Sequence, residues 1–261
     1  KKHVTVALSG DGGDEFFLGY SQYALHEKIW RTRHMGILPW DTAYKALMPL
    51  SGYEKLGGIL RRGKTVVDAW RQPNAQALAR YWFDRYRSGT VPIKEQVGVE
   101  MLNFPTMADA PSTAGLWDAG TYLPDDILVK VDRAAMANSL ETRAPLLDHR
   151  IIEFALRLPP QYKFDSMVGK KVLREVLYRH VPRQLVDRPK MGFTIPLAGW
   201  LRKDLRAWVE YLLAEIPNNS DLFNKAMIDQ IWGEHLACKR DHTEKLWGML
   251  MLLSFIKRSN V

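Results

Sequence analysis

Hydrophobic and polar residues change their spacing abruptly near the start of the chain. Residues 4–8 (VTVAL) form a short run of apolar and β-branched residues, which is typical of a buried strand, and a Ser-Gly-Asp-Gly-Gly cluster follows it. From residue 14 to residue 30, apolar residues such as Phe17, Tyr20 and Ala24 recur at near-helical spacing. The pattern therefore predicts a strand, a glycine turn and a helix, which is half of a βαβ unit.

Helical patterns dominate the rest of the chain. Between residues 37 and 115, six prolines interrupt the pattern, which predicts short helices and loops without a strand. Apolar stripes with helical spacing follow at residues 125–140, 148–156, 168–180, 201–216 and 244–257. The sequence contains no internal repeat, no low-complexity segment and no clear linker.

The strand predicted over residues 4–8 has no partner in this pattern. An isolated strand leaves backbone N–H and C=O groups unpaired, so a sheet must supply its neighbours. We therefore expect a parallel sheet whose other strands lie upstream in a longer chain, and the absence of an initiating Met agrees with that expectation. The length of 261 residues fits one large domain.

Composition excludes several classes of protein. Hydrophobic residues make up 46% and charged residues 25%, which excludes disordered, collagen-like and small disulfide-stapled chains. Cys238 is the only cysteine, so no intrachain disulfide or multi-thiolate zinc site can form, and we expect a reducing, cytoplasmic location. The most apolar runs are shorter than the roughly 18 to 20 residues that span a bilayer, so we expect no membrane segment.

The charge of the chain raises the question of a polyanionic partner. The formal net charge is +8, from 37 Lys and Arg against 29 Asp and Glu. The basic residues are scattered and separated by acidic ones, whereas nucleic-acid binding is typical of basic residues gathered in one patch. A basic surface without a nucleic-acid partner is therefore the favoured interpretation.

The glycine-rich turn after the predicted strand is the first candidate for chemistry. Its sequence, SGDGGDE at residues 9–15, opens a helix, where free backbone N–H groups and the helix dipole favour phosphate. Asp11, Asp14 and Glu15 would repel a phosphate unless Mg²⁺ lay between them, so the pattern fits a magnesium nucleotide. An acidic helix cap after a glycine turn is the alternative interpretation. A GxxxxGK[ST] pattern at residues 58–65 lacks the preceding buried strand of a P-loop, so we assign it no nucleotide.

Two later segments carry charges in apolar surroundings. Asp132, Glu141, Arg143 and Asp148 lie among apolar residues, and we expect them to be paired, either in a partly buried structural network or around a polar substrate. The segment GKKVLRE at residues 169–175 places lysines at the start of a helix, where they are unfavourable unless a phosphate or carboxylate lies nearby. The seven histidines show no metal-binding spacing, so we assign no metal to them.

Four motifs together resemble the synthetase domain of the glutamine-dependent asparagine synthetase family. They are SGDGGDEFFLGY at residues 9–20, YLPDDILVKVDRAAMANSLETRAPLLD at 122–148, GKKVLRE at 169–175 and RPKMGFTIPLAGWLR at 188–202. The resemblance spans nearly the whole chain and implies an α/β fold of the adenine nucleotide alpha hydrolase-like (PP-loop) type. It implies that residues 1–261 are the C-terminal part of one such domain, mostly α-helical here because the upstream parallel strands are missing.

The resemblance also implies a reaction. In this family ATP activates a carboxylate as an acyl-adenylate, pyrophosphate leaves with Mg²⁺, and ammonia attacks to give an amide. By the motif match, Ser9 and Gly10 would lie near ATP, Asp14 would bind Mg²⁺, and Asp11 would lie near the activated carboxyl group and ammonia. Lys170 matches the family's catalytic lysine, whose charge would stabilise the α-phosphate and the departing pyrophosphate.

Partners and missing parts follow from the same resemblance. The expected partners are aspartate or another carboxylate, ammonia from glutamine, an upstream glutaminase domain, and a second copy of the chain in a homodimer. The family's SGGxDS pyrophosphate loop and its glutaminase domain do not occur in residues 1–261, so we expect this chain alone to be inactive. Leu18 replaces the family's usual Gly and Ala135 replaces a frequent Ser, which bears on local packing and substrate preference.

Three alternatives to aspartate amidation stay open on the sequence. The first is an amidotransferase that acts on another carboxylate, such as a sugar acid of a polysaccharide. The second is a nucleic-acid-binding protein, and the third is a non-catalytic remnant that serves in assembly.

Overall fold

A computed structural model describes residues 3–33, 63–83, 92–93, 104–165, 168–187, 195–218 and 220–259. The chain divides into two compact units. Unit 1 comprises Lys1–Phe83 and Leu102–Arg188, and unit 2 comprises Asp84–Met101 and Pro189–Val261. The single domain expected over residues 1–261 stays a prediction.

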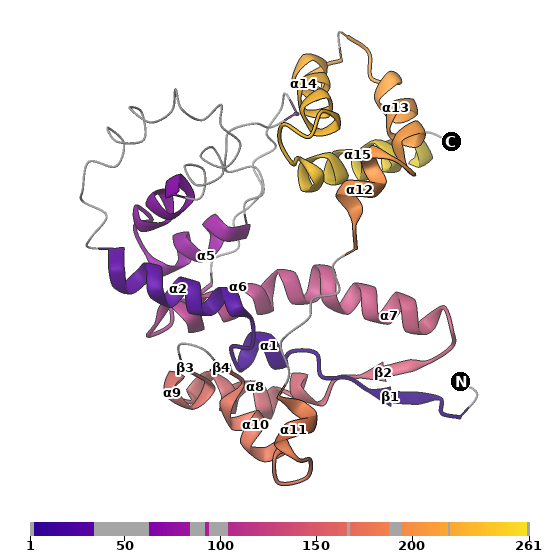
Figure 1. The fold of residues 1–261 in the computed structure, drawn as a ribbon. Helices are drawn as coiled ribbons and strands as arrows, with labels where there is room; N and C mark the ends of the chain where they lie inside the picture. Colours follow the sequence, from indigo (N-terminus) through magenta and orange to yellow (C-terminus); the bar gives the residue numbers. More distant parts are fainter. Residues whose placement is uncertain are drawn as a thin grey trace. The chain divides into compact units, whose positions relative to one another are not determined.

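The first strand of unit 1 pairs within the chain. β1 (Val6–Leu8) lies parallel to β2 (Glu141–Arg143), with Val6 opposite Glu141 and Leu8 opposite Arg143 (Figure 1). The predicted parallel pairing is confirmed, but the expectation that every partner strand lies upstream was wrong for β2. The sequence of β2, Glu-Thr-Arg, shows no alternation of apolar and polar residues. The strand has no buried apolar face, and backbone hydrogen bonds to β1 hold it in place.

Two helices replace the single helix predicted over residues 14–30. α1 (Gly13–Phe16) ends after one turn, and four residues separate it from α2 (Ser21–Thr32). Leu18 adopts a left-handed backbone conformation with φ of 56°, which a helix cannot contain. The apolar periodicity continues through the break because Phe17 and Leu18, which lie in the turn between the two helices, are both buried.

A nearly continuous helical run crosses unit 1 (Figure 1). It consists of α6 (Ala110–Gly120), the π-helix η3 (Leu123–Leu128) and α7 (Val129–Met136). Asp109 caps α6 by accepting a hydrogen bond from Ser112 N at 2.7 Å, and Pro111 suits the first turn. The helix predicted over residues 125–140 is confirmed by η3 and α7, but it ends at Met136.

The remaining elements of unit 1 are short. They are a helix at residues 63–70, α5 (Ala75–Phe83), η4 (Pro145–Leu147), α8 (His149–Arg157), α9 (Pro160–Lys163), β3 (Phe164–Asp165), β4 (Val168–Gly169), α10 (Lys171–Leu177) and α11 (Arg183–Val186). The helix predicted at residues 148–156 is confirmed as α8, which Asp148 caps. The helix predicted at 168–180 begins later, because residues 168 and 169 pair with β3 in an antiparallel hairpin.

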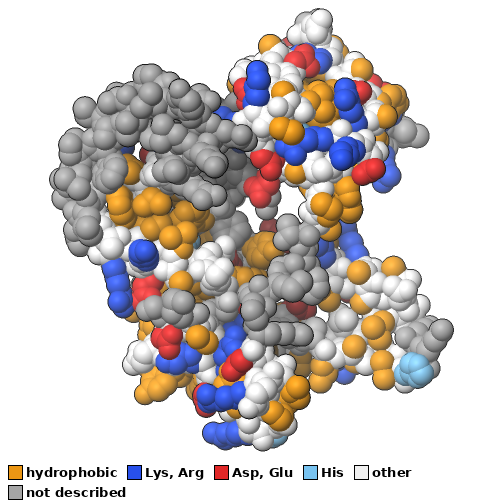
Figure 2. Space-filling model, in the orientation of Figure 1, with side chains coloured by type: hydrophobic (Ala, Val, Ile, Leu, Met, Phe, Trp, Pro, Cys, Tyr) orange, Lys and Arg blue, Asp and Glu red, His pale blue; other side chains and the backbone are white. Residues whose placement is uncertain are grey.

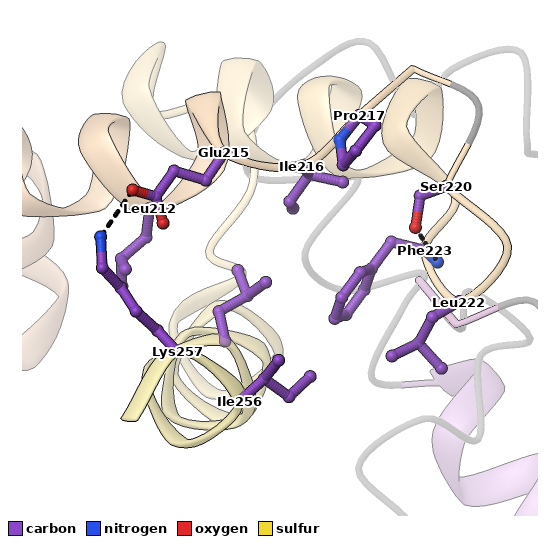
Figure 3. Close-up of a pocket in the computed structure, with 10 residues that line it drawn as sticks. Leu212, Glu215, Ile216, Pro217, Ser220, Leu222, Phe223, Ile256 and Lys257 are labelled. Atoms are coloured by element: carbon purple, nitrogen blue, oxygen red, sulfur yellow. Dashed lines mark hydrogen bonds and ion pairs between the residues drawn. The ribbon is translucent and has the colours of Figure 1, made fainter. Parts of the chain in front are cut away.

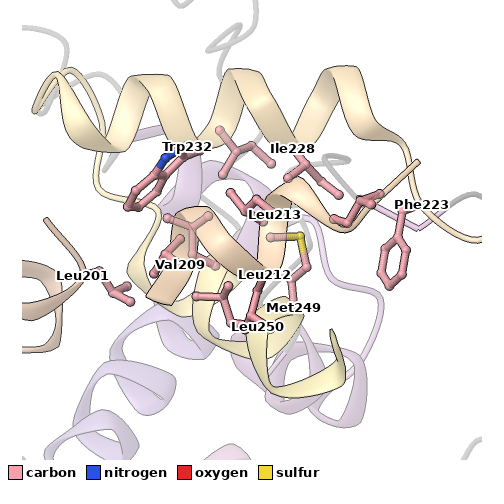
Figure 4. Close-up of a cluster of buried hydrophobic side chains, with 12 residues drawn as sticks. Leu201, Val209, Leu212, Leu213, Phe223, Ile228, Trp232, Met249 and Leu250 are labelled. Atoms are coloured by element: carbon pink, nitrogen blue, oxygen red, sulfur yellow. The ribbon is translucent and has the colours of Figure 1, made fainter. Parts of the chain in front are cut away.

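Unit 2 is a helical unit around one apolar core. α12 (Leu197–Arg202), α13 (Arg206–Ala214), α14 (Lys225–Leu236) and α15 (Thr243–Ser259) surround it. The buried members of this core, which Figure 4 shows, are Leu201, Val209, Leu212, Leu213, Ile216, Phe223, Ile228, Ile231, Trp232, Leu246, Met249 and Leu250. The pattern at 244–257 is confirmed as α15, whereas that at 201–216 splits into α12 and α13. We did not predict α14, although Asn224 is a good helix cap that accepts from Met227 N.

Two surface properties follow from the described residues. On the face drawn in Figure 2, Lys and Arg side chains are interspersed with acidic and apolar ones. Among the described helices, none has both the length and the apolar character that are needed to cross a bilayer.

Candidate functional site

The turn between β1 and α1 brings the first group of predicted residues together. Ser9 N extends the strand ladder by donating to Arg143 O at 2.8 Å, and Ser9 Oγ donates to Asp11 Oδ2 at 2.8 Å. Gly12 has φ of 84°, and a Cβ added there would lie 2.2 Å from Leu147 Cδ2. Only glycine fits both the backbone conformation and the space at this position.

Lys170 reaches this turn from a distant part of the sequence. Its Nζ lies 2.9 Å from Asp14 Oδ2, and both side chains are about one quarter exposed, at 30% for Lys170 and 25% for Asp14. Its backbone N donates to Phe17 O at 2.9 Å. Because this ion pair is only partly shielded from solvent, the ammonium group of Lys170 can exchange Asp14 for another anion.

The backbone of Lys170 adopts a strained conformation. Its φ of 59° lies in the left-handed region, although Lys170 is neither Gly nor Asn. Such a residue costs on the order of 1 to 3 kcal/mol and persists only where its surroundings hold it, most often at functional sites. Here Lys170 precedes the first turn of α10, so the strained backbone directs the side chain back to α1 instead of along its own helix.

Two glycines allow the segments around Asp14 and Lys170 to approach closely. A Cβ at Gly19 would lie 2.1 Å from Asp14 Oδ1 and 2.2 Å from Lys170 Cε. A Cβ at Gly169 would lie 2.0 Å from Leu18 O. A larger residue at Gly19 would collide with both members of the ion pair, and one at Gly169 would collide with the backbone of Leu18 and Gly19.

Carboxylates at the turn set the limits for a metal ion. Among the described residues, no group of three or more His, Cys, Asp or Glu could hold a metal ion. Mg²⁺ in nucleotide sites is commonly bound by one or two carboxylates with phosphate oxygens and water as the other ligands. Asp11 and Asp14 fit that arrangement in number, but Lys170 already engages Asp14 Oδ2.

Two buried carboxyl groups lie beneath this turn, and each accepts a tyrosine hydroxyl. Tyr20 donates to Glu15 Oε1 at 2.8 Å, and Tyr23 donates to Asp118 Oδ2 at 2.6 Å. Burial raises the pKa of Glu15 above its usual value and raises the pKa of Asp118 to about 7, although the tyrosine hydrogen bonds oppose both shifts. Gln22 adds a second hydrogen bond to Asp118 at 3.0 Å.

From the sequence, Glu15 is expected only as a carboxylate beside phosphate, and Asp118 is not expected at the site at all. Asp118 is fully buried on α6, where it follows Leu116 and Trp117 at a position that the helix turns inward. A charged residue on the apolar face of a helix is a usable signal, because such a residue needs a buried partner. The partner could not be read from sequence, since Tyr23 is 95 residues away.

Of the four charged residues expected to form a network, Asp132, Glu141 and Arg143 are exposed and Asp148 is half-buried. Arg143 Nε donates to Glu141 Oε1 at 2.7 Å in an exposed pair, and Asp148 pairs with Arg150 at 2.8 Å. The prediction of a partly buried network among these four residues was therefore wrong within the described chain, because Glu141 and Arg143 face outward from β2 and Asp148 pairs with Arg150. Their alternative role around a polar substrate stays a prediction. The basic motif at residues 188–194 lies outside the described residues, as do residues 58–62 of the GxxxxGK[ST] pattern.

Two cavities lie away from the predicted site residues. One, of about 420 Å³ in unit 2, has a largely apolar wall that includes Leu212, Ile216 and Phe223, with the Lys257–Glu215 ion pair at its edge (Figure 3). The other, of about 450 Å³ in unit 1, is lined in part by Trp30 and Asp109. Neither is lined by Ser9, Gly10, Asp11, Asp14 or Lys170.

Comparisons with known proteins agree across most of the chain. The family model described as asparagine synthase matches residues 1–257. Asparagine synthetase [glutamine-hydrolyzing] 1 of Bacillus subtilis is 29% identical over 97% of this chain and 40% of its own length. Asparagine synthetase [glutamine-hydrolyzing] 3 of the same organism is 23% identical over 88% of this chain and 33% of its own length. Amidase chyE of Penicillium rubens is 23% identical over 81% of this chain and 35% of its own length.

These comparisons cover the two units together. The family match includes β1, the glycine turn and Lys170 in unit 1, and α12, α13, α14 and most of α15 in unit 2. No solved structure matches the chain significantly. The chain spans at most about 40% of the length of these relatives. With the motif order, the Asp14–Lys170 ion pair and a match over 257 residues, the chain belongs to the asparagine synthase family.

Proposed function

We propose that this chain forms part of an ATP-dependent amide ligase of the asparagine synthase type, with a PP-loop-like nucleotide fold. The observation that carries the proposal is the ion pair between Lys170 and Asp14 at 2.9 Å, which joins two motifs 156 positions apart in the sequence. A strained lysine placed beside a carboxylate at a glycine turn is costly for a purely structural role. Such a lysine is suited to stabilise negative charge that develops on phosphate.

Each predicted residue has a proposed role at this turn. Ser9 and Gly10 would contact ATP, because they lie where β1 ends and the chain turns back toward α1. Asp14, with Asp11 beside it, would supply carboxylate oxygens to Mg²⁺, and phosphate oxygens would complete its ligands. Asp11 would also lie near the activated carboxyl group and ammonia.

Lys170 would change its partner when the nucleotide binds. Its ammonium group now holds Asp14 Oδ2, so that oxygen becomes available to Mg²⁺ only when Lys170 turns to another anion. The α-phosphate and the departing pyrophosphate are such anions in acyl-adenylate chemistry. The exchange would keep both the carboxylate and the ammonium paired, which lowers the cost of desolvating them.

The carboxylate that receives ammonia is proposed to be aspartate. The similar proteins from Bacillus subtilis carry the name asparagine synthetase and are described as glutamine-hydrolyzing. We extend that description to this chain and propose that ammonia comes from glutamine through a glutaminase domain outside these 261 residues. A cytoplasmic location and a homodimer stay predictions.

Pyrophosphate release tests this proposal directly. The full-length gene product would be assayed with ATP, Mg²⁺, aspartate and either glutamine or ammonium. We expect Lys170→Ala to lower kcat by about 100-fold or more, because it removes the charge that meets the leaving group. Lys257→Ala is the matched control, since Lys257 also forms an ion pair, with Glu215 of unit 2, and we expect nearly unchanged turnover.

The acceptor and the reaction are separable in this assay. Release of pyrophosphate with another carboxylate, such as a uronic acid, but not with aspartate would overturn the acceptor and keep the ligase. Full activity of Lys170→Ala would overturn the assigned site. No pyrophosphate release with any carboxylate, from a folded full-length protein, would overturn the ligase function.

A further inference from the structure

The turn at residues 17–20 is the support on which Lys170 rests. Gly19 N donates to Asp14 O at 2.8 Å, which closes the turn onto α1. Lys170 N donates to Phe17 O at 2.9 Å, which fixes the start of α10 to the same turn. The turn therefore holds the backbone of both members of the ion pair.

Movement of this turn would alter the ion pair at once. A Cβ added at Gly19 would lie 2.2 Å from Lys170 Cε, and one added at Gly169 would lie 2.0 Å from Leu18 O. The turn and the segment that carries Lys170 are therefore in direct contact. Leu18 is also strained, with φ of 56°, and therefore needs other contacts to hold its conformation. Burial of Phe17 and Leu18 anchors the first half of the turn, and its second half needs a contact of its own.

The hydrogen bond from Tyr20 to Glu15 spans the turn and meets this need. Glu15 lies on α1 and is only 3% exposed, and Tyr20 is the last residue before α2. The hydroxyl donates to Glu15 Oε1 at 2.8 Å, so it connects the end of the turn to the helix where the turn begins. The ring of Tyr20 packs against Tyr23 and, edge-on, against Tyr122, which limits its freedom.

A second hydrogen bond of the same kind lies nearby but does not span the turn. Tyr23 donates to Asp118 Oδ2 and connects α2 to α6. Both carboxyl groups are buried and both bonds are short, at 2.8 Å and 2.6 Å. The two pairs join different elements, and Asp118 also accepts a hydrogen bond from Gln22. Only the Glu15–Tyr20 pair closes the turn that supports Lys170.

We propose that Tyr20 is a positioning residue, which holds Lys170 beside Asp14 through its hydrogen bond to Glu15. The proposal deepens the ligase function proposed above and rests on it only for its effect on turnover. The position of Lys170 itself can be measured without any substrate.

The direct test is the rate at which an amine-acylating reagent labels each lysine, read by mass spectrometry of the folded chain. An ammonium group held by a carboxylate reacts slowly, because only the free amine is nucleophilic. We expect Tyr20→Phe to raise the labelling rate of Lys170 about threefold to tenfold, the effect of losing one hydrogen bond. Tyr23→Phe is the matched control, and it should leave the rate at Lys170 within twofold of the original rate.

Two other lysines report on general loosening of the protein. Lys163 is 2% exposed in unit 1, so its labelling rate rises only if the unit opens. Lys257 forms its ion pair in unit 2 and should not respond. A positioning role predicts that Tyr20→Phe changes Lys170 alone, whereas a parallel rise at Lys163 or no change at Lys170 would overturn the proposal.

A conservative variant separates the hydrogen bond from the charge of Glu15. Glu15→Gln retains an amide oxygen that can accept from Tyr20, so its Lys170 labelling should stay within twofold of the original protein. A rise as large as that of Tyr20→Phe would show that the charge, and not the hydrogen bond, holds the turn, and would overturn the proposal.

Turnover then connects the positioning role to the ligase function. In the full-length gene product, Tyr20→Phe should lower kcat about tenfold and change KM for ATP less than twofold, because misplacement acts in the transition state. Unchanged kcat together with faster Lys170 labelling would overturn the role in turnover. If the full-length protein releases no pyrophosphate at all, the proposed function fails while the labelling result still decides the position of Lys170.

Discussion

The two units of this chain solve the problem of burial in different ways. Unit 2 buries twelve apolar residues in one core, with His235 and His242 as its buried polar residues within the described chain. In the described part of unit 1, the buried apolar residues form three smaller clusters. Between them it buries polar and charged side chains, namely Glu15, His26, Ser112, Thr113, Asp118 and Lys163.

The two units therefore differ in how many polar side chains they must stabilise away from water. Buried carboxyl groups and lysines lose hydration, so each needs a hydrogen bond or a shifted pKa to remain inside. Unit 1 supplies tyrosine donors to Glu15 and Asp118, next to the turn that holds Lys170. In unit 2 the buried polar groups serve the end of α14, where Arg202 donates to His235 O. The polar interior therefore lies in the unit that holds the candidate site, and the single apolar core lies in the other unit.

Truncation in the core of unit 2 should have the largest effect on stability. Leu250 is fully buried on α15, and Leu250→Ala should lower the free energy of unfolding by about 2 to 5 kcal/mol through lost burial and a cavity. The adjacent Met251 is 38% exposed, so Met251→Ala is the matched control and should cost less than about 1 kcal/mol. Urea unfolding followed by circular dichroism measures both. Equal losses would contradict a single apolar core in unit 2.

Replacement of the buried carboxyl group of Asp118 in unit 1 should have an intermediate effect on stability, and this effect should depend on pH. The pKa of Asp118 is raised to about 7 in the folded protein and is near 3.9 in an unfolded chain. Between these values the folded state binds more protons, so Asp118 lowers the free energy of unfolding as pH rises from about 4 to about 7. Asp118→Asn does not titrate, and we expect its stability relative to the original protein to rise by on the order of 2 to 4 kcal/mol over this range.

Thermal unfolding at several pH values measures this change. Glu153→Gln is the control, because Glu153 lies on the surface of α8 in an ion pair with Arg157 and should show little pH-dependent difference. His26 has a pKa lowered to about 3 by burial and contributes the opposite slope below about pH 6.5, but it is present in all three proteins and cancels in the comparison. A constant difference between Asp118→Asn and the original protein across pH would contradict a buried, largely protonated Asp118.

Surface ion pairs should have the smallest effect, and it should be equal in the two units. Arg143 pairs with Glu141 in unit 1, and Arg206 pairs with Glu210 in unit 2, each at an exposed position. We expect Arg143→Ala and Arg206→Ala each to change the free energy of unfolding by less than about 0.5 kcal/mol, because water and salt screen such pairs. A loss above about 1 kcal/mol for one of them would place part of the difference between the units on the surface.

The sequence indicated local structure well where local chemistry decides it. The strand ending at a glycine turn and the helices α8 and α15 were all predicted from residue spacing. The helix break at Leu18 was missed, because a left-handed leucine carries no signal in a hydrophobic pattern. β2 was missed as well, since its side chains face outward and only its backbone pairs.

The candidate site divides in the same way. The residue types, their order and the resemblance to one family can be read from the sequence, because these are properties of motifs. The contacts of Lys170 with Asp14 and of Tyr23 with Asp118 come from the folded chain. These contacts join residues 156 and 95 positions apart, so they arise from tertiary packing. The same packing buries Asp118 and thereby raises its pKa. Spacing along a chain carries no record of such contacts, because the free energy that selects them belongs to the folded assembly of side chains.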